Sequence, residues 1–216
     1  MTNAARIDLS ISIYFFSAMD LIEKVTIQGF HRSRLGDDRI HALGYREAES
    51  QQQRFMAMLD WGNLNGSSVL DLGCGYGDLR PFLAQHYQDT IYLGVDFLKE
   101  FISEAQQRYG HLPNTQFFQA DFLNVGLPEV DCVIASGSLN YRSKNELHPW
   151  QTISKMWEVA QRGVILNLLN AHHFKSGALL CGYDPEQVLS FCRQLDPHAS
   201  LRDDYLPDDF TIYMHK

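Results

Sequence analysis

The chain has 216 residues, of which 45% are hydrophobic and 20% are charged. This composition predicts one well-buried domain rather than two, and it argues against long disordered segments. The formal net charge is −8 and no run of lysines or arginines stands out. The sequence therefore disfavours a protein that grips nucleic acid through a basic face.

The cysteine and hydropathy patterns predict a cytoplasmic protein without a metal site. No two of the four cysteines form a C-x-x-C pair, which argues against a zinc site and against a disulfide scaffold. The apolar run at residues 11–18 is short and lacks the basic region of a signal peptide, so we expect none. No segment is long enough to cross a bilayer, and we expect no membrane partner.

The first 45 residues match no assignable pattern, and we expect residues 1–45 to form a cap or lid. Residues 46–216 are expected to form one domain, which opens with a helix over residues 47–59. Farther along, apolar runs alternate with helical patterns, and strands are expected at residues 69–72, 91–95, 116–119, 131–136 and 164–168. Strands that alternate with helices predict a doubly wound α/β fold with a parallel sheet.

The end of the chain departs from that alternation. Two further strands are expected at residues 200–205 and 210–214. The four residues between them permit a hairpin and forbid a parallel crossover. The sequence therefore predicts a mostly parallel seven-stranded sheet with an antiparallel last strand and helices on both faces.

The candidate ligand-binding residues follow the expected strands. In an open parallel sheet, ligands bind beyond the carboxyl ends of the strands. We therefore expect one cofactor site that gathers Asp71, Gly73, Cys74, Gly75 and Asp78 after the first strand, Asp96 and Phe97 after the second, Asp121 and Phe122 after the third, and Ser136 and Gly137 after the fourth.

The spacing of the glycines in the first of these loops is G-x-G-x-G. The third glycine of the dinucleotide fingerprint would fall at Asp78, where a carboxylate would repel a pyrophosphate. Four aspartates stand at the rim and one arginine, Arg80, lies near them, which suits a ligand with positive charge and hydroxyl groups. S-adenosylmethionine has a sulfonium, an ammonium, a ribose diol and an adenine, and it has no phosphate.

Each part of this ligand has a candidate partner in the chain. Asp71 can hold the ammonium, and Asp96 can accept hydrogen bonds from the ribose diol. Asp121 can accept from the exocyclic amine of adenine, with Phe97 and Phe122 packed near the adenine faces. Arg54, on the helix before the first strand, can pair with the methionine carboxylate, and backbone N–H groups at the start of the next helix can also receive it.

Residues 69–78, Val-Leu-Asp-Leu-Gly-Cys-Gly-Tyr-Gly-Asp, resemble the first motif of the class I S-adenosylmethionine-dependent methyltransferases. Residues 94–96 and 120–122 match the second and third cofactor segments of that family, and residues 131–137 occupy the fourth. The resemblance covers residues 47–216. It implies a seven-stranded Rossmann-like sheet and methyl transfer from S-adenosylmethionine, with S-adenosylhomocysteine as product.

The segment after the fourth strand bears on the methyl acceptor. DNA adenine and glutamine methyltransferases carry an Asn-Pro-Pro-Tyr-type motif there, whereas residues 138–141 read Ser-Leu-Asn-Tyr. This difference favours an oxygen or nitrogen nucleophile of a small molecule, methylated by in-line displacement. Three alternatives stay open: an RNA or protein methyltransferase of the same fold, a nicotinamide-dependent oxidoreductase, and a non-catalytic protein that retains the fold.

The sequence does not demand a catalytic residue, because methyl transfer requires alignment of donor and nucleophile first and a general base only for a protonated nucleophile. Tyr141, His172 and His173 are the candidates for such a base. The sequence gives no indication of the oligomeric state.

Overall fold

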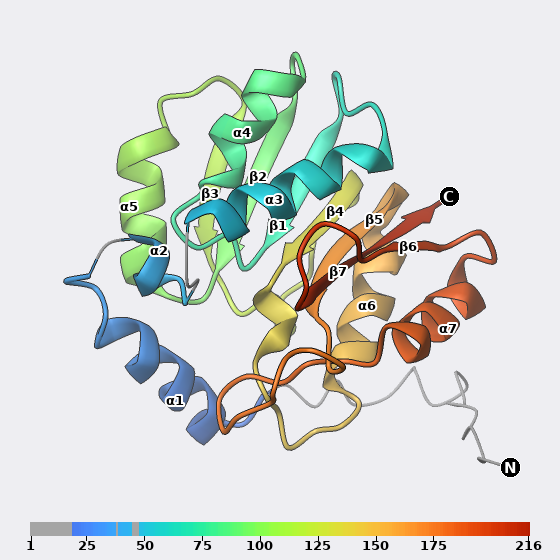
Figure 1. The fold of residues 1–216 in the computed structure, drawn as a ribbon. Helices are drawn as coiled ribbons and strands as arrows, with labels where there is room; N and C mark the ends of the chain where they lie inside the picture. The colour runs from blue at the N-terminus through green and yellow to red at the C-terminus, as the bar shows by residue number, and fades with distance from the viewer. Residues whose placement is uncertain (1–18, 38, 45–47) are drawn as a thin grey trace, which may run out of the picture.

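The computed structural model describes residues 19–37, 39–44 and 48–216 (Figure 1). Its centre is a seven-stranded sheet in the order β3-β2-β1-β4-β5-β7-β6. The strands are β1 (Ser68–Leu72), β2 (Ile91–Asp96), β3 (Thr115–Gln119), β4 (Val130–Ser136), β5 (Ala160–Leu169), β6 (Ser200–Arg202) and β7 (Asp209–His215).

Strand β7 is antiparallel to both of its neighbours, β5 and β6, and all other strand pairs are parallel. The predicted sheet with an antiparallel last strand is therefore confirmed. Two strand lengths were predicted wrongly. β5 begins at Ala160 because that residue already pairs with Val130 of β4. β6 ends at Arg202, whose side chain bonds Asp204 at 2.7 Å across the bend that follows.

Helices cover both faces of the sheet (Figure 1). Each face of the sheet has its own cluster of buried apolar side chains. The first cluster packs strand residues against the helices that precede β3, and the second packs strand residues against the helices that follow β4. In β1, for example, Val69 faces the first cluster and Leu70 the second, as the two-residue period of a strand requires. The helices are α3 (Ala48–Met58), α4 (Leu79–His86) and α5 (Lys99–Tyr109) on the first face, and α6 (His148–Val159) and α7 (Pro185–Leu195) on the second; η2 (Leu59–Trp61) and η3 (Ser138–Asn140) are short 3-10 turns.

Two further helices, α1 (Leu21–Arg32) and α2 (Arg39–Ala42), belong to neither layer. Figure 1 shows them at one end of the sheet. A capping box starts α1: the Asp20 side chain accepts from the Glu23 backbone N–H, and the Glu23 side chain accepts from the Asp20 N–H. We call residues 19–37 and 39–44 the lid. The lid makes up more than half of the cap predicted for residues 1–45. The division of the chain into a cap at residues 1–45 and a domain at residues 46–216 stays a proposal.

Among the described residues, no helix combines the length and the apolar composition needed to span a bilayer.

Candidate active site

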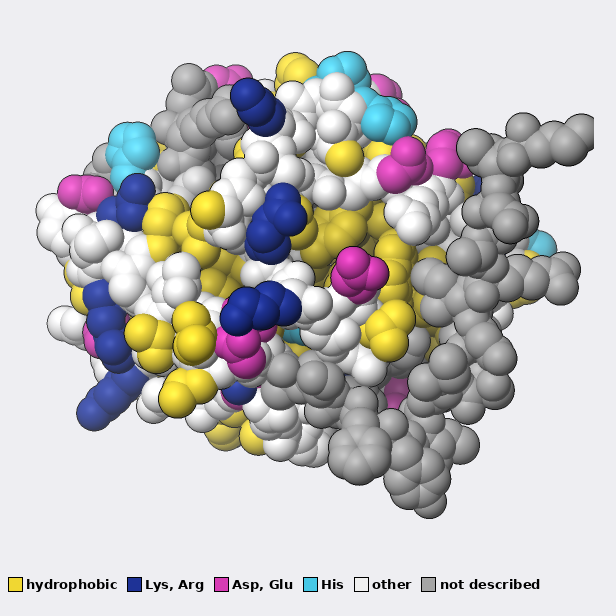
Figure 2. All heavy atoms as spheres, turned by 90° about the horizontal axis from the view of Figure 1, so that it is seen from below, with side chains coloured by type: hydrophobic (Ala, Val, Ile, Leu, Met, Phe, Trp, Pro, Cys, Tyr) yellow, Lys and Arg dark blue, Asp and Glu magenta, His cyan; other side chains and the backbone are white. Residues whose placement is uncertain are grey.

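One cavity of about 550 Å³ opens at the carboxyl ends of the parallel strands, beneath the lid. Seen from that side, Figure 2 shows apolar side chains in a hollow, with basic and acidic side chains interspersed around it. All predicted cofactor-binding residues line this cavity: Arg54, Asp71, Gly73, Cys74, Gly75, Asp78, Asp96, Phe97, Asp121, Phe122, Ser136 and Gly137. The chain therefore brings together in space the segments that the strand pattern predicted to converge.

The glycine-rich loop needs its glycines for geometric reasons. Gly73 has φ +76°, and a Cβ there would stand 2.3 Å from the Cβ of Ser138. Gly75 has φ +54°, and a Cβ there would stand 2.5 Å from Leu43 of the lid. Both positions thus combine a left-handed backbone with a close neighbour, and only glycine satisfies both. The lid packs directly on the loop.

Two buried carboxyl groups lie beside this loop. Asp96 accepts from the backbone N–H of Gly75 at 3.0 Å and from that of Leu98 at 2.9 Å, and so holds the loop against β2. Asp71 accepts from the Tyr92 hydroxyl at 2.5 Å. Burial raises the pKa of Asp71 to about 7 and that of Asp96 to about 6. Both groups would gain from a cationic or hydrogen-bond-donating ligand.

The other two rim aspartates are paired with cations of the lid. Arg39 binds Asp78 at 2.8 Å, and Lys24 binds Asp121 at 2.5 Å. The four predicted rim aspartates all line the cavity, but the expectation that Arg80 is the cation near them was wrong. Arg80 is buried away from the cavity, where it donates to Thr115 and to the Pro113 carbonyl. The cations that balance the rim come from a segment whose position the sequence did not indicate.

Arg54 forms an ion pair with Asp209 at the wall built by α3 and β7. Its Nε lies 2.9 Å and its Nη2 2.8 Å from the same Asp209 oxygen. The other Asp209 oxygen, Oδ1, is buried and has no hydrogen-bond partner among the described residues, and the same holds for the Ser136 hydroxyl. Both residues line the cavity, and a polar ligand there would supply the hydrogen-bond partners that these two atoms lack.

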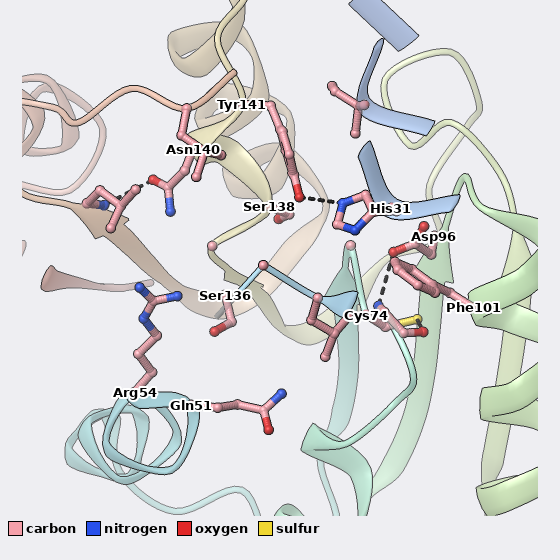
Figure 3. Close-up of a pocket in the computed structure, with 18 of the residues that line it drawn as sticks. His31, Gln51, Arg54, Cys74, Asp96, Phe101, Ser136, Ser138, Asn140 and Tyr141 are labelled. Carbon is pink, nitrogen blue, oxygen red and sulfur yellow. Dashed lines mark hydrogen bonds between the residues drawn. The ribbon is translucent and has the colours of Figure 1, made fainter. Parts of the chain in front are cut away.

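His31 and Tyr141 form a further contact of this site that the sequence did not suggest. His31 Nε2 lies 2.6 Å from the Tyr141 hydroxyl, and Nδ1 lies 2.7 Å from the Ala42 carbonyl oxygen. Figure 3 shows the two rings on the wall opposite Arg54. Tyr141 was a candidate base, whereas His31 lay in the unassigned segment, and only its position in an amphipathic helix could have drawn attention to it.

The two other predicted bases lie apart from that pair. His173 lines the cavity. His172 does not: its exposed ring bonds Asp184, the N-cap residue of α7, at 3.1 Å. The structure therefore removes His172 from the candidate site, because its ring turns outward to Asp184. In the part of the chain that the structure describes, no cluster of His, Cys, Asp and Glu is arranged to hold a metal.

Comparisons with known proteins agree on one family. Residues 69–163 match the methyltransferase domain family. Magnesium-protoporphyrin O-methyltransferase of Synechocystis is 30% identical over 179 residues, which are 77% of this chain and 71% of that protein. Rv1506c of Mycobacterium tuberculosis, which also carries a methyltransferase name, is 30% identical over 157 residues, 69% of this chain and 93% of that protein.

Solved structures show the same fold. The magnesium protoporphyrin IX methyltransferase of Synechocystis with bound S-adenosylhomocysteine aligns with a TM-score of 0.68 at 20% identity, over 89% of this chain and 99% of that one. The N-methyltransferase NodS of Bradyrhizobium japonicum aligns with a TM-score of 0.67 at 16% identity, over 88% and 98%. The chain belongs to the class I S-adenosylmethionine-dependent methyltransferases.

Proposed function

We propose that this protein transfers a methyl group from S-adenosylmethionine to an oxygen or nitrogen nucleophile of a small molecule. One observation carries the proposal: a single cavity gathers the glycine-rich loop, the aspartates at three strand ends and a tyrosine–histidine pair under a lid. Family membership decides against the nicotinamide-dependent alternative.

The residues of the cavity fit the cofactor. The glycine-rich loop lines the cavity at Gly73 and Gly75, and Asp209 Oδ1 and the Ser136 hydroxyl are buried polar atoms that have no hydrogen-bond partner among the described residues. In our proposal Asp96 holds the ribose, Asp121 the adenine amine and Arg54 the methionine carboxylate. When bound, the cofactor supplies an electrophilic methyl group on a sulfonium, and the chain supplies alignment and exclusion of water.

A small acceptor is favoured by the closure of the site. The lid contacts Asp78, Asp121 and Tyr141, which follow three of the parallel strands, and so covers part of the cavity and leaves less room for a macromolecule to reach it. Relatives are named for methylation of magnesium-protoporphyrin, 2-phytyl-1,4-naphthoquinone and trans-aconitate, all small molecules. Transfer to RNA or protein is the second candidate, and a cytoplasmic location remains a prediction.

Isothermal titration with S-adenosylhomocysteine tests the cofactor assignment. We expect binding by the wild type, and Asp96→Ala should weaken it by about 10- to 100-fold, because a hydrogen bond to a charged group contributes about 1.5–3 kcal/mol. Asp203→Ala, on the exposed bend after β6, is the matched control and should leave the affinity unchanged. Absence of binding by the folded wild type at millimolar ligand would overturn the proposal.

A further inference from the structure

The contacts of His31 fix the position of its proton. The Ala42 carbonyl can only accept a hydrogen bond, so the Nδ1 atom, 2.7 Å away, carries the proton and donates it. In the neutral ring Nε2 is then an acceptor, and the Tyr141 hydroxyl, 2.6 Å away, must donate to it. The Tyr141 hydroxyl therefore already donates to Nε2 of His31, and the Ala42 carbonyl fixes the tautomer of that histidine.

The surroundings favour the neutral ring. His31 is only 4% exposed, and edge-on aromatic contacts with Phe30, Phe101 and Tyr141 enclose it. Burial, with the nearby Arg34 charge, lowers the pKa of His31 below its ordinary value of 6.5. The titratable and charged groups on the elements packed around the pair are Lys24, Arg32 and Arg34 of the lid, Asp96 at the end of β2, Glu100 on α5, Asp121 after β3 and His148 on α6. Of these cations, Lys24 and Arg32 are paired with Asp121 and Glu100.

We propose that Tyr141 and His31 form a proton relay for the acceptor, and that the acceptor is therefore a hydroxyl of phenol-like or enol-like acidity on an apolar framework. Tyr141 is the catalytic residue that touches the acceptor, and His31 positions it and takes the proton. The inference rests on the proposed methyl transfer and names the substrate class of that same cavity.

The step balances in atoms and charge. The acceptor oxygen uses a lone pair to form its bond to the methyl carbon, and the sulfur keeps the electrons of the bond that breaks. The acceptor proton passes to the Tyr141 oxygen while the Tyr141 proton passes to Nε2 of His31. The imidazolium that results replaces the positive charge lost from the sulfonium. The buried cavity thus keeps a constant charge beside Asp96, which avoids the cost of changing charge in a medium of low dielectric.

The acceptor class follows from what the relay can do. A carboxylate has no proton to give at neutral pH and would gain nothing from a base. An aliphatic alcohol is too weak an acid for a histidine whose pKa is lowered, whereas a phenol or enol is closer to it. The apolar side chains of Ile27 and Phe30 in the lid line the same cavity as Leu180, and they suit a flat ring.

The first test uses 4-nitrophenol, catechol and 2-naphthol as acceptors, with benzoate and benzylamine as comparison compounds. We expect the phenols to be methylated in preference. Tyr141→Phe should lower kcat by about 10²- to 10⁴-fold, the usual contribution of general-base catalysis, with little change in affinity for S-adenosylhomocysteine. Tyr87→Phe, whose hydroxyl bonds the Gly62 carbonyl elsewhere, is the matched control.

His31→Asn keeps a donor for the Ala42 carbonyl and removes the acceptor nitrogen. In the wild type, kcat should fall as pH drops through the lowered pKa of His31, because the protonated ring cannot accept. His31→Asn should lose this fall of kcat at low pH, whereas a purely structural role of His31 would leave the fall in place. The control His111→Asn should keep it.

A binding measurement serves as a readout independent of turnover. In the complex with S-adenosylhomocysteine, the absorbance of bound 4-nitrophenol should show a lowered pKa of the phenol, and Tyr141→Phe should abolish the shift. If protein that binds S-adenosylhomocysteine binds none of the phenols, or if both variants keep kcat within about threefold, the relay is wrong and the proposed methyl transfer stands. Loss of S-adenosylhomocysteine binding itself would instead defeat the proposed function.

Discussion

Arg39 of α2 and Asp78, the residue that ends the glycine-rich loop, form an ion pair of 2.8 Å. Tyr109 of α5 donates to the same Asp78 oxygen at 2.9 Å. The lid is thereby attached to the loop on which the cofactor is proposed to lie, so release of the ligand requires this contact to open or to slide.

Arg39→Met should therefore speed the exchange of S-adenosylhomocysteine more than it changes the affinity. A partly exposed ion pair contributes about 0.2–1 kcal/mol, so we expect dissociation to accelerate by up to about fivefold. Stopped-flow measurement of ligand release checks this. Arg108→Met removes an arginine from another exposed pair, with Glu104 on the outside of α5, and should leave release unchanged. Equal acceleration in both variants would contradict the role of the lid.

Gly73→Ala should destabilise the protein by about 2–4 kcal/mol, because it adds a clash with Ser138 to the strain of a positive φ. Gly66→Ala is the matched control: its φ of +67° carries the same strain, yet a Cβ there meets nothing within 4 Å. Urea unfolding of both variants separates the two contributions. Equal losses would mean that the approach of Ser138 is unimportant.

Asp71→Asn should stabilise the protein, and more so as pH rises. The folded-state pKa of Asp71 is raised from 3.8 to about 7, so its carboxyl favours the folded state below pH 3.8 and loses that contribution as pH rises to about 7. Asparagine does not titrate and can still accept from Tyr92. We expect a gain on the order of 4 kcal/mol near pH 8 that shrinks toward pH 4, measured by urea unfolding. A gain independent of pH would refute the burial of charge as its cause.

Arg54→Met should weaken binding of S-adenosylhomocysteine and spare methylthioadenosine, which lacks the amino-acid end. We expect the affinity for S-adenosylhomocysteine to fall about 10-fold more than the affinity for methylthioadenosine, because a charge-assisted hydrogen bond to the carboxylate is lost. Because Asp209 would be left buried without its partner, the fold itself will be less stable, and methylthioadenosine binding controls for that. Equal losses for both ligands would remove Arg54 from the carboxylate site.

The parts of the site that strand patterns determine could be predicted from the sequence. Asp71, Asp96 and Asp121 lie at or just beyond the carboxyl ends of three parallel strands, and these ends meet at one edge of the sheet, so no further knowledge is needed to bring them together. The hairpin of β6 and β7 was likewise fixed by the length of its connection.

The partners of those residues could not be predicted. Lys24, Arg39 and His31 reach the rim from a lid that no local pattern orients, and the His31–Tyr141 bond joins residues 110 positions apart. The outward turn of His172 depends on an ion pair with Asp184 that strand spacing does not encode. The apolar run at residues 11–18, which includes the aromatic residues 14–16, lies outside the described residues.

The lid precedes every strand in the chain, yet it docks on residues synthesised much later. During translation α1 leaves the ribosome before Asp78, Asp121 and Tyr141 exist, and closing a connection of about 100 residues costs more entropy than closing a hairpin. Assembly of the sheet should therefore precede closure, and the completed chain should pass through a species in which the α/β core is formed and the lid does not yet cover the cavity. Such a species is where a chaperone or an early ligand would act.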